Sequence, residues 1–429
     1  MWENTKKKRI ILNIFLGLLI VAVVAVLGYF VMQIQAENRA HDEELSKIYE
    51  QQQRQQSEAR QESVSAIDEQ YARQMETVQQ YVPGIVCWGD NTTAAVSGSL
   101  NYPFVLQTYI NTYMCDIYDF SSTVENALDF ARLDWSKYKL SIPVVNMASG
   151  KESTYTIMGR AGVDPYITYW DVTIPADTTP VRIDLSSSEG KNVSPLTGGD
   201  LGVNPVVIAG IEGQLSLNME DYAYNGTLHY TFTRLTPGEE TFIPAGTVVK
   251  TASEDQYRNY IHVVLIGMYG EYSSADELVQ QVKTLLARQT QNPERFIVIG
   301  PYAHNIYAAS TSEMNAVDSA MISAFGSRYI SIRRYLIGDG YTDAGISPTG
   351  EDNFYIAQEI VPPSFKAASH SEELNSLAHK LIGKLVYTRM DSLGYFDEIK
   401  QELNLTETTK QIIKSNPGYF DAIINTALK

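Results

Sequence analysis

Hydrophobic residues form one long run near the start of the chain, from Ile10 to Met32, in which Asn13 is the strongly polar exception. About 23 apolar residues in a helix match the roughly 30 Å hydrocarbon core of a bilayer. The run is longer than the apolar part of a typical signal peptide, about 7–15 residues, although Ile34-Gln35-Ala36 resembles a cleavage site. The pattern therefore predicts an uncleaved transmembrane helix over residues 10–32.

A polar segment that is rich in Gln and Glu and contains neither Gly nor Pro follows from Gln33 to Tyr81. Residues with three- and four-residue spacing occupy its second half, namely Val64, Ile67, Tyr71, Gln74, Val78 and Tyr81. Such spacing is that of a coiled-coil seam, through which the chain would form a homo-oligomer; the simpler interpretation is a solvated single helix. Because Val82-Pro83-Gly84 ends the pattern, we expect a helical stalk over residues 33–82.

Short apolar runs that alternate with amphipathic stretches follow Gly84. The runs expected to be strands are Ile85–Trp88, Pro143–Asn146, Tyr260–Gly267, Arg295–Gly300 and Arg328–Ile332. Buried strands that alternate with helices are typical of a parallel sheet covered on both faces. The pattern predicts an α/β domain over residues 83–391, in which a Gly/Asp-rich loop follows residue 334 and a final helix covers Leu374–Met390. Residues 392–429 are expected to form a C-terminal helical tail.

Residues 171–253 break this rhythm, because alternating apolar and polar positions replace the helical spacing. The expected strands are Val181–Ile183, Val206–Ala209, Gln214–Leu217 and His229–Phe232, separated by Gly, Pro, Asn and Ser. We expect a small β domain inserted between the second and third strands of the parallel sheet.

The charged residues predict the orientation of the membrane helix. Lys6-Lys7-Lys8-Arg9 precede the apolar run, and a basic flank favours the cytoplasmic side. Residues 1–9 are therefore expected inside the cell and everything after residue 33 outside. The net charge of −17 argues against nucleic acid or an anionic lipid surface as partner of the outer part, and leaves neutral glycans or proteins.

Two cysteines, Cys87 and Cys115, and six scattered histidines define no disulfide framework and no zinc motif. One bridge or two buried thiols are the alternatives, and the thiols are the simpler one because Cys87 lies within the first expected strand. The sequence predicts no metal and no cofactor.

Candidate chemistry lies in Gly84–Leu106, where the first strand ends in Gly89-Asp90 and a loop of small residues leads to a helix that begins near Tyr102. Parallel sheets place their sites at such strand ends. This stretch resembles the first block of the SGNH (GDSL-type) esterase and lipase family, in which the strand ends in Gly-Asp-Ser and the serine is the nucleophile. Asn91 stands at the serine position here, and an amide has no nucleophilic oxygen that a base can activate.

The resemblance extends to three further blocks. Val144–Gly162 is similar to the second block, which places Gly150 as a backbone donor to the oxyanion and includes Glu152, Thr156-Ile157 and Arg160. In the third block, Tyr269 stands where the family has an asparagine that donates to the same oxyanion.

The last block of the family carries Asp-x-x-His just before the final helix. The matching stretch here places His370 at the aspartate and Glu373 at the histidine. In the family, serine, histidine and aspartate act as a unit, so the loss of any one removes most of the activity.

The resemblance implies a flavodoxin-like, three-layer SGNH fold. With nucleophile, base, orienting acid and side-chain donor all replaced, it implies a pseudoenzyme that binds a cell-envelope glycan, an acylated polymer or a protein partner. One alternative is an active carbohydrate or lipid esterase in which Thr92 or Ser97 is activated by His370 and Glu373. Another is a structural stalk protein.

Structural roles are the simpler expectation for several of these residues. Asn91 would cap the turn that follows it, Asp90 would accept hydrogen bonds from loop N–H groups, and Glu373 would be the N-cap or first-turn acid of the last helix. His304, in the loop after the fourth strand, is a further candidate for the cleft.

Overall fold

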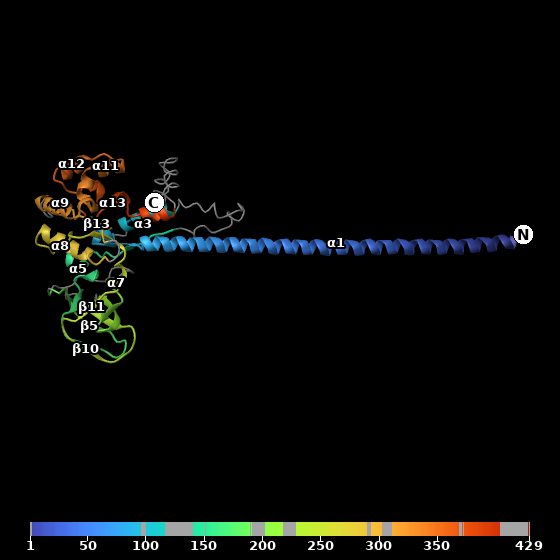
Figure 1. Ribbon diagram of the computed structural model, residues 1–429, viewed down its shortest axis with the longest axis horizontal. Coiled ribbons are helices and arrows are strands. Elements are labelled where there is room, and N and C mark those ends of the chain that lie inside the picture. The colour runs from blue at the N-terminus through green and yellow to red at the C-terminus, as the bar shows by residue number, and fades with distance from the viewer. Residues whose placement is uncertain are drawn as a thin grey trace. The chain divides into compact units, whose positions relative to one another are not determined.

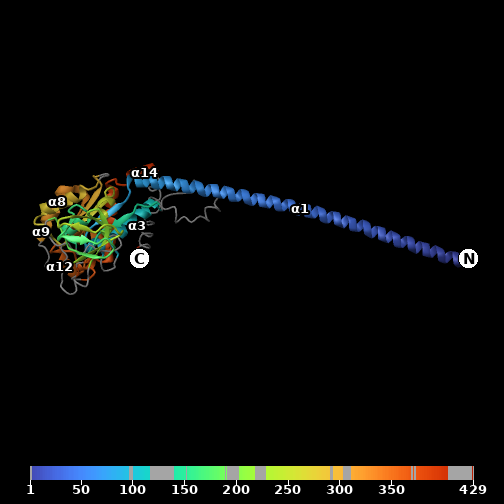
Figure 2. The same ribbon diagram turned by 90° about the horizontal axis from the view of Figure 1, so that it is seen from below.

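The computed structural model describes residues 2–95, 100–115, 140–150, 152–188, 190, 202–217, 229–289, 293–302, 311–368, 371, 373–403 and 428. Residues Trp2–Tyr81 form one continuous helix, α1 (Figures 1 and 2). It ends where Val82-Pro83-Gly84 was expected to end it. Its apolar segment is exposed and is long and apolar enough to cross a membrane, a property that a signal sequence shares.

The last turns of α1 belong to the compact α/β unit, which starts at Tyr71. Val78 and Val82 are buried in a core cluster of this unit, and Tyr71, Met75 and Tyr81 pack against the same cluster. The three- and four-residue spacing over residues 71–82 therefore has an explanation within the chain, because these positions cover the sheet.

The expected parallel sheet is present. Its strands are β1 (Ile85–Trp88), β2 (Val144–Asn146), β12 (Ile261–Leu265), β13 (Phe296–Ile299) and β14 (Tyr329–Ile330). All of their pairings are parallel and their order is β14-β13-β12-β1-β2. In chain order this is 2-1-3-4-5, a doubly wound arrangement whose switch point lies between β1 and β12.

Helices cover both faces of this sheet. Alternate residues of β1 point to opposite sides: Ile85 and Cys87 enter one core cluster, Val86 and Trp88 the other. The first cluster is closed by α3 (Tyr102–Cys115) and α13 (Ser376–Ser392), and the second by α5 (Thr154–Arg160), α8 (Ala275–Leu286) and α9 (Thr311–Phe325) (Figure 1). The result is three layers, with the ends of the strands left to the connecting loops.

The β insertion lies between β2 and β12, as expected, and begins somewhat earlier than residue 171. Its strands are β3 (Tyr166–Thr168), β4 (Val172–Ile174), β5 (Val181–Ile183), β6 (Leu185–Ser186), β7 (Val206–Ile208), β8 (Ile211–Leu217), β9 (Tyr230–Arg234), β10 (Thr241–Ile243) and β11 (Val248–Lys250). Seven of them form one antiparallel sheet, and β4 pairs with β10.

The seven-stranded sheet nearly closes into a barrel. Its two ends, β5 and β6, are consecutive pieces of one extended stretch interrupted only at Asp184: β5 pairs with β9 and β6 pairs with β3. Apolar side chains of this sheet form a core cluster of their own, including Ile208, Leu215 and Phe232.

The expectation of a Gly/Asp-rich loop after residue 334 is wrong. Two short helices, α10 (Ile332–Ile337) and α11 (Asp339–Ala344), occupy this part of the chain. Ser331 caps α10, and burial of Leu336 and Tyr341 holds the helices on the core despite Gly338 and Gly340. Tertiary burial thus outweighs the low helix propensity of glycine.

The remaining elements are short, apart from the last long helix. They are α2 (Asn91–Ala94), α7 (Ser253–Gln256), η3 (Gly326–Arg328), α12 (Gly350–Ile356), η4 (Pro363–Phe365) and α14 (Asp397–Glu402). The last long helix begins at Ser376 rather than Leu374, because Asn375 is its N-cap. Of the expected helical tail, α14 is described, and residues 404–427 lie outside the described part.

Candidate functional site

The turn after β1 is built on Asp90. Its Oδ1 accepts a hydrogen bond from the backbone N–H of Thr92 at 2.9 Å, which makes Asp90 the N-cap of α2. The expectation that Asp90 accepts from loop N–H groups is confirmed, and Asp90 rather than Asn91 provides the cap. Glycine is required at position 89, because a Cβ there would collide with the Thr93 side chain and lie 3.0 Å from the Leu265 carbonyl oxygen.

The Asp90 carboxyl group is fully buried, and its Oδ2 has no hydrogen-bond partner among the described residues. Burial raises the pKa of Asp90 from about 3.8 to about 7, and the negative charge of Glu152 adds to the rise while the Thr92 hydrogen bond opposes it. A carboxyl group in this state can exist protonated near neutral pH.

Asn91 and Thr92 are also buried, as the first two residues of α2. The Thr92 Oγ1 lies 3.1 Å from the hydroxyl of Tyr302, a residue in the loop after β13. The Tyr302 backbone N–H in turn points to the sulfur of Met268, after β12, at 3.2 Å. The ends of β1, β12 and β13 are therefore tied together, and sequence analysis missed Tyr302, whose only signal was its place just beyond a buried strand.

The loop after β2 joins the same cluster. Asn146 Nδ2 donates to the Thr93 carbonyl oxygen at 2.8 Å, and the Met147 N–H donates to the Cys87 carbonyl oxygen at 2.9 Å. Gly150 follows in a half-buried turn, at the strand end where the resemblance placed it.

The loops after β2 and β12 are bonded directly to each other. The Thr154 hydroxyl donates to the carbonyl oxygens of Gly270 at 3.1 Å and Glu271 at 2.8 Å, and the Ser153 hydroxyl donates to the Glu271 carboxylate. Tyr269 is half-buried in the turn that precedes Gly270. We call the group Asp90, Asn91, Thr92, Gly150 and Tyr269 the strand-end site.

A buried ion pair supports this site. The Arg160 guanidinium donates to both carboxylate oxygens of Glu152, at 2.7 to 3.1 Å, and neither side chain is more than 1% exposed. The Arg160 carbonyl oxygen also accepts from Ser253 Oγ at 2.6 Å, which ties α5 to the end of the insertion. A buried bidentate pair of this kind fixes the loop that carries Gly150.

The last block is described in part. Glu373 is half-buried in the loop before α13: its N–H donates to Ser371 Oγ at 2.9 Å, and its carbonyl oxygen accepts from the Ala367 N–H at 2.9 Å. The expectation that Glu373 is the N-cap or first-turn acid of the last helix is wrong, because the Asn375 side chain caps that helix by accepting from the Ala378 N–H at 3.0 Å.

Three candidate residues, Ser97, His304 and His370, lie outside the described residues. Cys87 is a free buried thiol, and burial raises its pKa. Among the residues that the structure describes, no cluster of His, Cys, Asp and Glu has the arrangement of a metal site.

The strand-end site thus combines buried and half-buried hydrogen-bonding groups near a topological switch point, where open parallel sheets bind their ligands. Its described side-chain groups bond to neighbouring loops, and Asp90 is a buried carboxyl group that can be protonated. The Thr92 hydroxyl is the described candidate for a nucleophile; it contacts the Tyr302 phenol and also interacts with the Asp90 carboxyl group, and neither is an imidazole base. No model of a protein family matches the chain, and no curated protein matches it in sequence.

Proposed function

We propose that this chain is a membrane-anchored, extracytoplasmic SGNH-hydrolase-like protein whose strand-end site binds a ligand without hydrolysing it. The ligand would be a cell-envelope glycan, an acylated polymer or a protein partner. The observation that carries the proposal is the turn after β1: Asn91, which the resemblance aligns with the nucleophile, lies on a buried helix start, and Asp90 is used as the cap.

Two features of the fold support the resemblance on which this proposal rests. The parallel strands have the order 2-1-3-4-5, and the first and third matched blocks follow β1 and β12, the two strands at the switch point. The Glu152–Arg160 pair, part of the second-block pattern, is buried where it steadies the Gly150 turn.

The membrane part of the proposal rests on α1. Its apolar segment follows Lys6-Lys7-Lys8-Arg9, so the positive-inside rule places the N-terminus in the cytoplasm and the α/β unit outside. Protease added to intact cells should digest the chain beyond residue 33. Full protection of the α/β unit would contradict this orientation.

Ester hydrolysis tests the functional part. The full chain, purified in lipid nanodiscs, should neither hydrolyse p-nitrophenyl acetate above the rate of empty nanodiscs nor be labelled by a fluorophosphonate. Asn91→Ser alone should not restore activity, because a serine without a base remains a neutral hydroxyl.

A wild-type turnover that is lost in Thr92→Ala or Ser97→Ala, and kept in the exposed control Thr342→Ala, would overturn the proposal. It would favour an esterase in which Thr92 or Ser97 is activated by His370 and Glu373.

A further inference from the structure

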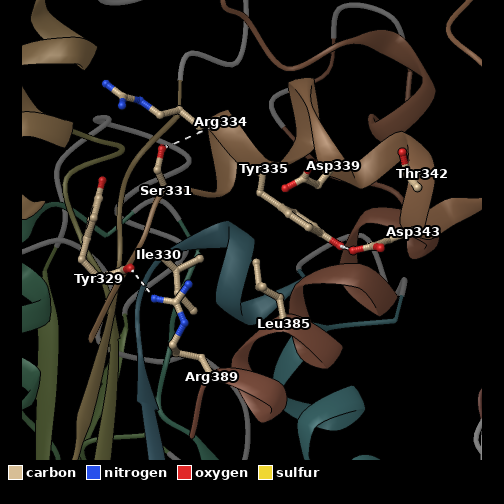
Figure 3. A pocket seen from close by; sticks show the side chains of 10 residues that line it. All are labelled: Tyr329, Ile330, Ser331, Arg334, Tyr335, Asp339, Thr342, Asp343, Leu385 and Arg389. Atoms are coloured by element: carbon tan, nitrogen blue, oxygen red, sulfur yellow. Dashed lines mark hydrogen bonds between the residues drawn. The ribbon is translucent and has the colours of Figure 1, made fainter. Parts of the chain in front are cut away.

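A second concavity lies at the lateral edge of the parallel sheet, beside the last strand β14. This lateral pocket has a volume of about 500 Å³ and is lined by Tyr329, Ile330, Ser331, Arg334, Tyr335, Asp339, Thr342, Asp343, Leu385 and Arg389 (Figure 3). Pockets that bind small molecules have volumes of about 300–1,000 Å³. In the sheet order, β14 is separated by β13 from the strands β12 and β1 that carry the strand-end site.

The pocket does not leave an open strand edge for another β-strand. Arg389 Nη1 donates to the carbonyl oxygens of Ser327 at 2.6 Å and Tyr329 at 3.1 Å, and the Tyr329 N–H donates to the Gly326 carbonyl oxygen. The outward-facing polar groups of Tyr329 are therefore already used, which argues against pairing with a peptide strand.

Several side-chain groups in the pocket remain unpaired within the described part of the chain. They are the Asp339 carboxylate, the Thr342 hydroxyl and the Nε and Nη2 groups of Arg389, and Asp343 uses one carboxylate oxygen, Oδ2, to accept from the Tyr335 hydroxyl at 2.6 Å. Acceptors thus come from α11, and donors come from Arg389 on α13. Figure 3 shows the two groups on different walls, with the Tyr335 ring between helices.

The balance of these groups selects the ligand. Two carboxylates disfavour an anion, whereas the Arg389 guanidinium disfavours a cation and requires an acceptor. A neutral polyol can hydrogen-bond to the carboxylates of α11 and to the Arg389 guanidinium at once, because each of its hydroxyl groups both donates and accepts. The Tyr335 ring, together with Ile330 and Leu385, supplies apolar surface for the C–H faces of such a ligand.

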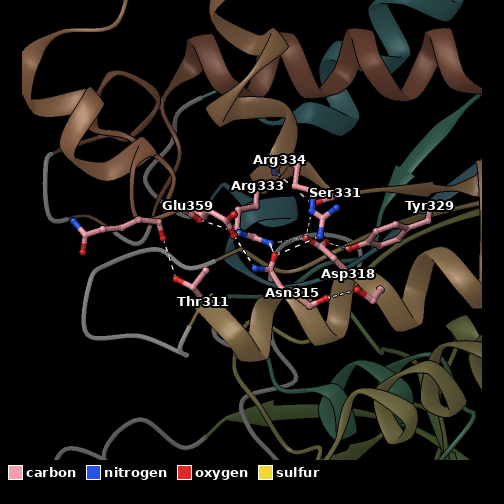
Figure 4. A network of polar contacts seen from close by, with 10 residues as sticks. Thr311, Asn315, Asp318, Tyr329, Ser331, Arg333, Arg334 and Glu359 are labelled. Carbon is pink, nitrogen blue, oxygen red and sulfur yellow. Dashed lines mark hydrogen bonds and ion pairs between the residues drawn. The ribbon is translucent and has the colours of Figure 1, made fainter.

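The wall at β14 is held rigid by the polar network of Figure 4. Asp318 accepts from Arg333 Nη2 at 2.6 Å, from Arg334 Nε at 2.9 Å and from the Tyr329 hydroxyl at 2.5 Å. Arg334 and Tyr329 line the pocket, so their positions are set before a ligand arrives. Preorganisation of this kind lowers the entropic cost of binding.

We propose that the lateral pocket binds a neutral saccharide unit between the carboxylates of α11 and Arg389 of α13. The site is separate from the strand-end site, and its occupancy does not depend on whether that site hydrolyses esters.

Calorimetric titration of the full chain in phosphatidylcholine nanodiscs, free of glycosidic detergent, tests this proposal. The probes are maltose, cellobiose and diacetylchitobiose at millimolar concentrations. At least one should bind the wild type, and Thr342→Trp, which fills the pocket from an exposed helix position, should weaken that binding at least about tenfold. Asp339→Ala, also at an exposed position, should weaken it about threefold or more and serves if the tryptophan variant fails to fold.

Thr284→Trp provides the matched control, because Thr284 is an exposed threonine on α8, which packs on the sheet through the other core cluster. Its saccharide affinity should equal that of the wild type. Failure of all three probes to bind overturns the proposal. Binding that survives both Thr342→Trp and Asp339→Ala also overturns it, since the sugar then binds elsewhere, and that result leaves the proposal for the strand-end site standing.

Discussion

At the carboxyl edge of the parallel sheet, the side chains of Asp90, Asn91 and Thr92 are buried among neighbouring strand-end loops, whereas the lateral edge at β14 exposes Asp339, Thr342 and Asp343 to solvent. Polar groups at the first edge bond to loops of the same unit, as Thr92 does with Tyr302. Those at the second edge are in part unpaired within the described residues. The two edges therefore differ in how many polar groups they leave available to a ligand, although both carry carboxylates and hydroxyls.

The difference shows that the position of a site in a fold and the availability of its groups are separate properties. The carboxyl edge has the position that parallel sheets use for ligands, but much of its hydrogen-bonding capacity holds the loops together. The lateral edge has no such general role, yet it offers donors and acceptors at low structural cost. Substitutions should accordingly destabilise the first edge far more than the second.

The largest difference is expected for the ion pairs. Arg160→Ala leaves Glu152 buried without its partner and should lower the free energy of unfolding by about 5 kcal/mol. Arg334→Ala, at the lateral pocket, removes one of the two arginines that pair with Asp318. Because the Arg334 side chain is 48% exposed and Asp318 keeps Arg333, the free energy of unfolding should fall by about 1 kcal/mol or less. Urea unfolding of the full chain, followed by tryptophan fluorescence, measures both. Equal losses in the two variants would remove the contrast between the edges.

The next effect is the pH dependence that Asp90 contributes. The pKa of its carboxyl group rises from about 3.8 to about 7 on folding, so the folded state binds the additional proton. The stabilisation by the protonated form is complete below pH 4 and is lost as the pH rises through 7. Relative to Asp90→Asn, which has no such proton, the wild type should lose roughly 4 kcal/mol between pH 4 and pH 8, at 1.36 kcal/mol for each of about three pKa units.

Urea unfolding of both proteins at a series of pH values gives this difference. A constant difference between wild type and Asp90→Asn across the range would show that the buried carboxyl group is not protonated on folding.

The smallest effect compares two threonines. Thr92→Val keeps the volume and removes the hydroxyl that contacts Tyr302 and Asp90, which should cost about 1 kcal/mol. Thr342→Val changes an exposed hydroxyl that has no described partner and should stay within about 0.5 kcal/mol of the wild type. Melting temperatures of the two variants in the same nanodiscs provide the measurement, and a Thr342→Val loss as large as that of Thr92→Val would contradict the comparison.

Parts of the strand-end site could be predicted from the sequence. Gly89-Asp90 after an apolar run indicated a turn at a strand end, and Gly150 was placed in the turn after the second strand. Tyr302 and the Ser153–Glu271 contact could not be predicted, because their partners are more than a hundred residues away along the chain. The lateral pocket was missed as well, because it depends on α10 and α11, which replace an expected loop.

What the sequence by itself determined is the membrane-length apolar segment, the end of α1 at Val82-Pro83-Gly84, the alternation of buried strands with helices, and the β insertion between the second and third strands. These follow from local properties: hydrophobic length, helix-breaking residues and periodicity. Tertiary structure alone decided that residues 71–82 cover the sheet, that β5 and β6 nearly close the insertion into a barrel, and that Asp90 is buried. Each depends on contacts between segments that are far apart in the chain. The spacing of residue types along the sequence does not specify which of those segments pack against each other.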